Sequence, residues 1–155
     1  LEPAVREAAA GDSRITYWGF PSQETLLRMY ASADVLVNAH SARHSSARYL
    51  FPSKLIEYLA TGVPVVSTNS TPEVAEIYGE VASVTESESA VEIAEAILKL
   101  AVQSAADRRA LGAQARDFVL REKTWAIQAR RVADFATGRM SVACEGRIGA
   151  TGSDR

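Results

Sequence analysis

The chain alternates between short apolar runs and longer stretches in which apolar residues recur with helical spacing. Four of the short runs predict strands, at residues 14–18, 34–38, 63–67 and 81–84. The second and third have consecutive apolar positions, which is typical of strands that are buried on both faces. Strict alternation of strands with helices predicts an α/β fold, with a Rossmann-like parallel sheet of about four strands flanked by helices.

Helical spacing and terminal residues place helices between and after these strands. The first is predicted at residues 3–10, and the second begins after the cap residue Ser22 and ends near residue 33. Pro52 suits the first position of a third helix, which ends at Gly62. The other predicted helices run from residue 71 to Gly79, from a cap at Ser87 or Ser89 through Leu100, from 107 to 121 and from 125 to 137.

Composition narrows the possible functions. The 155 residues suffice for one domain, which we place at residues 1–137; residues 138–155 lack periodicity and are expected to form a mobile tail. The 17 basic and 19 acidic residues give a net charge of −2, which excludes a strongly basic nucleic-acid-binding protein. A single cysteine, Cys144, excludes an internal disulfide and a CxxC metal site. No apolar run approaches the roughly 20 residues of a membrane-spanning helix.

Loops at one edge of the predicted sheet are the candidates for ligand binding. In open parallel sheets, ligands bind outside the carboxyl ends of the strands. The loops expected there are residues 19–22, 39–51 and 68–71. The second is polar and without regular period, and its length is typical of a functional loop. His40 and Arg48 lie in it; a guanidinium such as that of Arg48 matches the geometry of a phosphate, although a plain surface arginine is an equal alternative.

The segment from residue 51 to residue 66 carries the clearest chemical pattern. A helix that starts at Pro52 and Ser53 presents unpaired N–H groups, which suit a phosphate. The Ser53 hydroxyl and the Lys54 ammonium add a donor and a cation, and Glu57, one turn further on, suits the vicinal hydroxyls of a ribose. The alternative is that Lys54 and Glu57 form an ordinary surface pair and Ser53 only caps the helix.

The order of several motifs resembles the C-terminal, donor-binding domain of retaining glycosyltransferases of the GT-B fold. This large family includes sucrose synthases and bacterial polysaccharide transferases, and the resemblance covers about residues 1–137. The motifs are Tyr17-Trp18-Gly19, the series Leu26, Tyr30, Ala33 and Asp34, the block Pro52-Ser53-Lys54 with Glu57-Tyr58, the join Gly62-Val63-Pro64-Val65-Val66, and Thr124-Trp125. The Pro-Ser-Lys block is similar to that of one subgroup of the family.

The resemblance implies a role for each matching residue. Glu57 matches the glutamate that accepts hydrogen bonds from the ribose of the donor. Ser53 and Lys54, after Pro52, match the residues whose backbone amides face the diphosphate. Gly19 and Phe20 match the loop near the nucleotide base. The loop that contains His40 and Arg48 would face the donor sugar.

Two departures from the family pattern shape further expectations. Tyr49 stands where many members carry a first glutamate, eight positions before Glu57. The family domain also has two strand–helix units before the region matched by Leu1, so we expect the chain to be the latter part of a donor domain. On the family strand order, residues 15–18 would then either pair directly with residues 35–38, exchange elements with a second copy, or leave the chain poorly folded.

The resemblance predicts transfer of a sugar from a nucleotide-diphosphate sugar, a substrate, with no cofactor and no metal site. The acceptor would be a glycan or a lipid-linked glycan held by a further N-terminal domain, without which the chain would be inactive. A cytoplasmic location at the inner face of a membrane, with peripheral membrane association, and a role in bacterial polysaccharide synthesis follow by the same analogy. The alternative is a non-catalytic, flavodoxin-like α/β interaction domain that binds no nucleotide and uses the Leu26 helix or the C-terminal helices as its interface.

Overall fold

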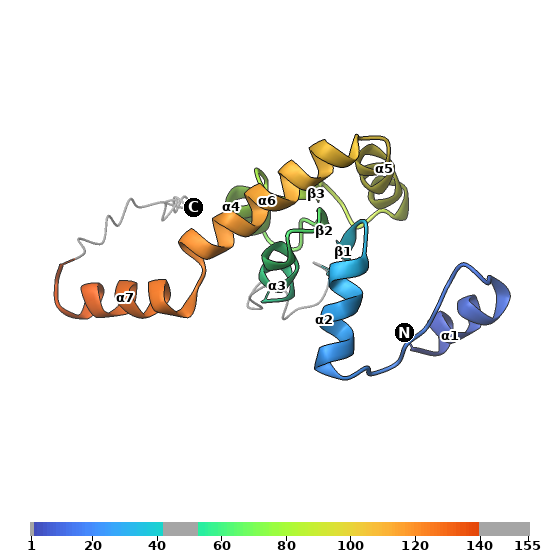
Figure 1. The fold of residues 1–155 in the computed structure, drawn as a ribbon, viewed down its shortest axis with the longest axis horizontal. Helices are drawn as coiled ribbons and strands as arrows, with labels where there is room; N and C mark the ends of the chain where they lie inside the picture. The colour runs from blue at the N-terminus through green and yellow to red at the C-terminus, as the bar shows by residue number, and fades with distance from the viewer. Residues whose placement is uncertain (1, 42–52, 140–155) are drawn as a thin grey trace, which may run out of the picture.

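The computed structural model describes residues 2–41 and 53–139, and the side chains of Pro72 and Glu73 are not part of that description. Helices and strands alternate in the central part of the chain, with three further helices after the last strand (Figure 1). In chain order they are α1 (Glu2–Gly11), α2 (Gln23–Ser32), β1 (Leu36–Asn38), α3 (Ser53–Thr61), β2 (Val65–Thr68), α4 (Pro72–Tyr78), β3 (Ser83–Thr85), α5 (Ala90–Ala101), α6 (Ala105–Glu122) and α7 (Trp125–Ala136).

The three strands form one parallel sheet in the order β1-β2-β3. Val37 lies opposite Val66, and Val66 in turn lies opposite Ser83. The predicted α/β fold with a parallel sheet between helices is therefore confirmed. Three of the four predicted strands are present with small shifts at their ends.

The predicted strand at residues 14–18 is wrong. This segment is an irregular connection between α1 and α2, and it does not pair with residues 35–38. The Asp12 carboxylate accepts a hydrogen bond from the backbone N–H of Arg14 at 2.9 Å, which forms a local turn. Ile15 and Trp18 remain 41% and 60% exposed. β-Branched and aromatic residues favour a strand only where a neighbouring strand and a covering layer are available.

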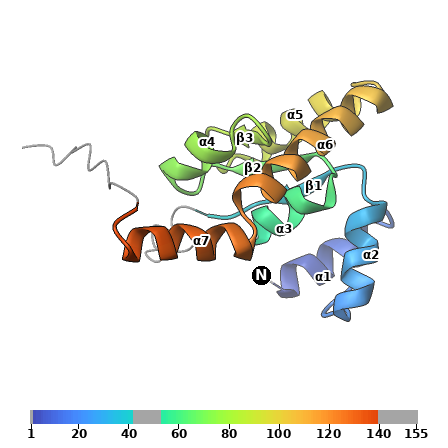
Figure 2. The ribbon, with the colours of Figure 1, turned by 60° about the vertical axis from the view of Figure 1, so that its left-hand side comes forward.

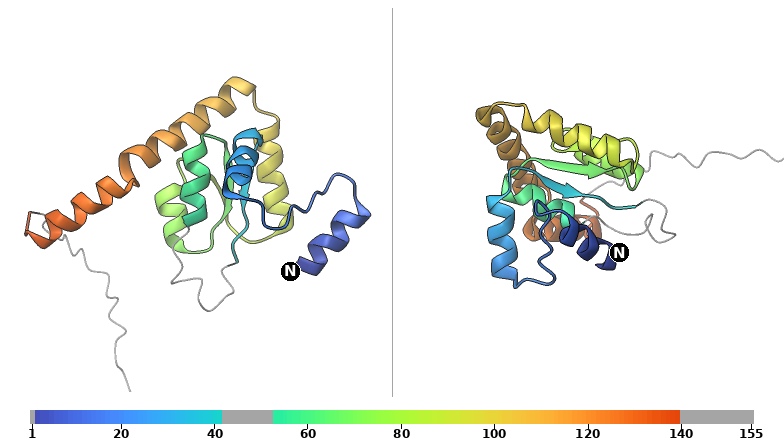
Figure 3. Two further views of the ribbon diagram at one scale, coloured as in Figure 1. Left: turned by 60° about the horizontal axis from the view of Figure 1, so that its bottom comes forward. Right: turned by 90° about the vertical axis from the view of Figure 1, so that its right-hand side faces the viewer.

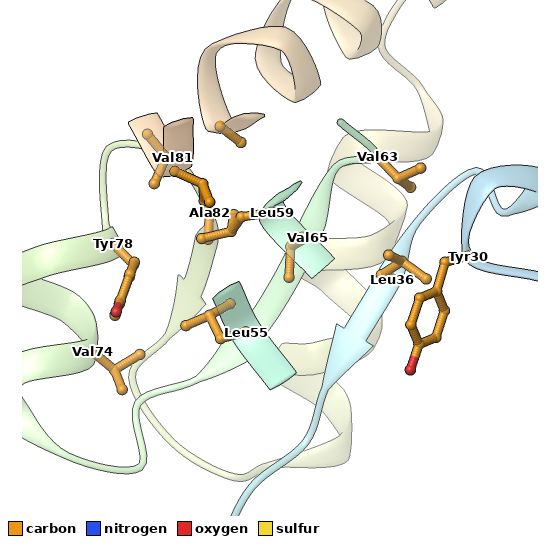
Figure 4. Close-up of a cluster of buried hydrophobic side chains, with 12 residues drawn as sticks. Tyr30, Leu36, Leu55, Leu59, Val63, Val65, Val74, Tyr78, Val81 and Ala82 are labelled. Carbon is orange, nitrogen blue, oxygen red and sulfur yellow. The ribbon is translucent and has the colours of Figure 1, made fainter. Parts of the chain in front are cut away.

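Helices cover the sheet on both faces because β2 is apolar on both (Figure 2). Val65 and Val66, which are consecutive and point to opposite faces, are 1% and 0% exposed. Val65 packs in a cluster with Leu55 and Leu59 of α3 (Figure 4). That cluster also includes residues from α2, α4 and α6. Val66 packs with Ala96 and Leu100 of α5 on the other face.

A contact between two glycines sets the packing of α6 on α3. Gly62 follows α3 with a positive φ of 78°, and Gly112 lies in the middle of α6. A Cβ built on Gly112 would lie 1.8 Å from the carbonyl oxygen of Gly62, so only glycine permits this approach. Arg116, one turn further along α6, donates a hydrogen bond to the carbonyl oxygen of Ala60 at 3.0 Å. Its charge is placed favourably at the negative end of α3.

The first and last helices of the described part carry little of the core. Neither α1 nor α7 contains a buried residue. α7 extends away from the sheet, and it exposes Trp125, Val132 and Phe135 (Figure 3). Side chains cap the helices as predicted for Ser22, and Ser89 rather than Ser87 caps α5.

Substitution of Gly112 by alanine is expected to destabilise the fold by about 1–3 kcal/mol, because the new methyl group would force α6 away from α3. Urea denaturation followed by circular dichroism measures the change. Gly11→Ala is the matched control, since a Cβ there meets nothing within 4 Å, and we expect it to be neutral within about 0.5 kcal/mol. Equal stability of Gly112→Ala and the wild type would refute this account of the α3–α6 packing.

Candidate functional site

Polar side chains gather where the strands end. Asn38, Ser67 and Thr68 stand at the carboxyl ends of β1 and β2 and are 9%, 0% and 2% exposed. The Asn38 side-chain amide donates a hydrogen bond to the Ser67 hydroxyl at 3.0 Å. Buried polar groups are stable only when they are paired, and this pair ties the two strands together at their ends.

The hydroxyl of Thr68 holds the segment that follows β1. It donates to the carbonyl oxygen of His40 at 2.6 Å and accepts from the backbone N–H of His40 at 3.0 Å. Both polar backbone groups of His40 are therefore fixed by one side chain from the neighbouring strand. The Ser41 hydroxyl donates to the Glu88 carboxylate at 2.7 Å, so the same segment is also joined to the residues that precede α5.

His40 thus lies at the carboxyl edge, where it was predicted, and its main chain is held in place. Its Nδ1 atom is buried and has no hydrogen-bond partner within the described part of the chain. The same holds for the side-chain oxygen of Asn69, the residue after β2. Asn69 was not singled out from the sequence; its place in the predicted loop at residues 68–71 was the only signal for it.

The predicted phosphate-binding and ribose-binding residues begin α3. Ser53 is the first residue of the helix, and Ser53, Lys54 and Glu57 are all exposed. The ion pairs found among the described residues do not include one between Lys54 and Glu57, so the surface pair considered as an alternative is not formed. Figure 4 shows that the β1 arrow points toward the end of α3 that carries Leu55, in its first turn. The first turn of α3 therefore lies toward the end of the sheet at which β1 finishes.

Two tyrosines lie beside the Glu57 face of α3. Tyr30 of α2 and Tyr58 of α3 meet edge to face, with ring centroids 4.9 Å apart. Burial raises the pKa of Tyr30 to about 12, and the neighbouring Tyr58 and the carboxylate of Glu57 add to the effect. The sequence predicted Tyr30 only as part of an apolar stripe.

The remaining predicted residues are not brought to this edge by any contact within the described structure. Gly19 has a positive φ of 63°, consistent with a turn. Phe20 is 95% exposed, so its side chain packs against nothing in residues 2–41 or 53–139. Pro52 and Arg48 lie outside the described residues, as do residues 140–155 of the predicted tail.

The described residues contain neither a metal-binding cluster nor a membrane-spanning helix. No group of three or more His, Cys, Asp or Glu side chains in residues 2–41 and 53–139 is placed to hold a metal ion. Within the same ranges, every helix is too short or too polar to cross a bilayer.

Replacing Thr68 with the isosteric valine is expected to cost about 1–3 kcal/mol of stability, because the His40 carbonyl loses the Thr68 hydroxyl and the His40 N–H keeps only its longer hydrogen bond to the Asn38 carbonyl, at 3.2 Å. Chemical denaturation measures the loss. Thr16→Val is the control, since Thr16 is exposed, and it should change stability by less than about 0.5 kcal/mol. A Thr68→Val protein as stable as the control would show that this hydroxyl does not hold the edge.

The raised pKa of Tyr30 predicts a loss of stability at alkaline pH. The fold favours the neutral phenol, so its contribution is complete below the ordinary pKa of about 10 and is lost as the pH rises toward 12. Wild-type stability should therefore fall relative to Tyr30→Phe by about 1 kcal/mol per pH unit in this window. Urea titrations of both proteins at pH 8, 10 and 11 test this, with pH 8 as the reference. A difference independent of pH would contradict the assignment.

Residues 1–103 match the sequence model of a protein family described as glycosyl transferases group 1. No curated protein matches the chain. No solved structure matches it either.

Proposed function

The chain belongs to the group 1 glycosyltransferases, whose members act on a sugar donor and an acceptor, and from this premise we propose that its first 137 residues form the donor-binding part of the transferase. The donor in this proposal is a nucleotide-diphosphate sugar, and the sugar is transferred with retention of its anomeric configuration. No further cofactor is invoked. Acceptor binding is assigned to no residue of this chain.

The start of α3 is the observation that carries the proposal. A nine-residue helix begins at Ser53 with exposed Ser53 and Lys54, and exposed Glu57 follows one turn later. Backbone N–H groups in the first turn of a helix lack partners within the helix, and the helix dipole adds a partial positive charge. A diphosphate supplies the acceptors and the negative charge that this end of α3 lacks.

The proposed roles follow from the chemistry of the leaving group. Transfer breaks the bond between the anomeric carbon and a diphosphate oxygen, and the electron pair of that bond stays with the diphosphate. The first turn of α3 and the Lys54 ammonium stabilise the charge that develops there. Glu57 accepts hydrogen bonds from the ribose hydroxyls and fixes the nucleotide. His40 faces the donor sugar, and Pro52, Arg48, Gly19 and Phe20 complete the proposed donor site.

The wider setting is proposed by analogy with the family resemblance. The acceptor is a glycan or a lipid-linked glycan, and the whole protein works in the cytoplasm at the inner face of a membrane. The process served is bacterial polysaccharide synthesis.

Titration of the 155-residue chain with UDP, GDP and ADP in a calorimeter tests donor binding. One of the three is expected to bind, and Glu57→Ala should weaken that binding by about tenfold or more, because a hydrogen bond to a charged group is lost. Glu95→Ala, which removes an exposed carboxylate from α5 on the other face of the sheet, is the control and should bind normally.

Two results would count against the proposal. Failure of all three nucleotides to bind would favour a non-catalytic interaction domain. Equal affinity of Glu57→Ala and the wild type would remove Glu57 from the site.

A further inference from the structure

A cavity of about 320 Å³ lies between the beginning of α3 and the beginning of α7. The described residues that line it come from α3, from α7 and from the residue after α6; they are Ser53, Ile56, Lys123, Trp125 and Gln128. Figure 2 shows the first turns of α7 beside α3. None of the roles proposed above uses Lys123, which lies 70 positions after Ser53 in the sequence.

Most of the described polar groups around the cavity are hydrogen-bond donors that have no partner in the described part of the chain. Within residues 2–41 and 53–139, the hydroxyl of exposed Ser53, the Lys123 ammonium and the indole N–H of exposed Trp125 make no hydrogen bond or ion pair with protein groups. The Gln128 side chain donates to the carbonyl oxygen of Glu122 at 2.7 Å. The described lining therefore has one full positive charge and no carboxylate, so a ligand rich in acceptors and negative charge suits it.

The position of the Lys123 ammonium is set by aromatic rings. Its nitrogen lies 5.4 Å from the centre of the Tyr78 ring and 5.6 Å from that of Phe118. The two rings meet edge to face, 6.0 Å apart. A ring attracts an ammonium group through its quadrupole but does not neutralise it, as a carboxylate would. Lys123 is thus held in place with its charge still available.

The nearest acidic neighbour in sequence does not cancel this charge. The Glu122 carboxylate pairs with the guanidinium of Arg131 on α7. That pair, together with the Gln128 hydrogen bond, fixes the start of α7 against the end of α6. The same contacts therefore shape the cavity wall and occupy the carboxylate that could otherwise pair with Lys123.

We propose that Lys123 binds the donor diphosphate in this cavity, opposite the first turn of α3. The inference rests on the proposed function and adds to it a cation from a distant part of the chain. As the bond to the anomeric carbon breaks, the Lys123 side chain stabilises the negative charge that passes to the diphosphate. The acceptor hydroxyl oxygen forms the new bond to the anomeric carbon, and its proton passes to the departing diphosphate oxygen.

The first test measures the affinity of the full chain for UDP, GDP, ADP and inorganic pyrophosphate. Lys123→Met keeps the apolar stem and removes the charge, and we expect it to weaken pyrophosphate and nucleotide binding by about tenfold or more. Lys123→Arg keeps the charge and should retain most of the affinity. Lys99→Met is the matched control, because Lys99 lies on α5 and lines a different cavity, and it should bind as the wild type does.

The second test needs no variant, so it also answers the case in which Lys123→Met does not fold. The chain has three lysines, Lys54, Lys99 and Lys123. Acetylation with a limiting reagent, read by mass spectrometry, gives the reactivity of each amine. Saturating pyrophosphate should slow the modification of Lys123 and Lys54 and leave Lys99 unchanged.

The outcomes separate this inference from the proposed function. Nucleotide binding that Lys123→Met leaves intact, or an unprotected Lys123, would overturn the inference while donor binding stands. Pyrophosphate binding that depends on Lys123 without any nucleotide binding would support the anion site and refute the donor role. If neither ligand binds, both proposals are wrong.

Discussion

Complete burial of β2 is the constraint on which the rest of the structure depends. None of its four residues is exposed. A strand of this kind needs a neighbouring strand on each edge and a helical layer on each face. β1 and β3 occupy the edges, α3 and α5 cover the faces, and α6 packs outside α3. The parallel direction of the strands then follows from the crossover helices between them, because each helix returns the chain to the end of the sheet at which the strands begin.

That arrangement explains why the polar residues collect at one edge. Parallel strands end together, so the residues that follow them meet even when they are distant in sequence. Thr68 and His40 are 28 positions apart and share two hydrogen bonds. α3 must start near the same edge, because the chain leaves β1 there. The proposed donor site is thus a consequence of topology as much as of individual residues.

Much of this could be predicted from sequence where the signal is local. Consecutive valines predicted β2, Ser22 predicted the start of α2, and Pro52 predicted a helix start next to Ser53, the first residue of α3. The failure at residues 14–18 has a physical reason, since strand formation requires a partner that propensity does not report. The Gly62–Gly112 approach is a contact between residues distant in sequence, and Ser53 and Lys123 border the same cavity from distant parts of the chain. A single sequence has no local pattern for such contacts.

The glycine contact between α3 and α6 has a mechanical consequence. Lys123 lies eleven residues after Gly112, roughly 16 Å along a helical path. Ser53 lies nine residues before Gly62, roughly 13 Å back along α3. The contact therefore acts as a pivot for two antiparallel arms whose far ends border the same cavity. A rotation of about 5° there would displace Lys123 by about 1.4 Å, a shift large enough to disturb a hydrogen bond. Residues far from any ligand can in this way control how well the two sides of the cavity are aligned.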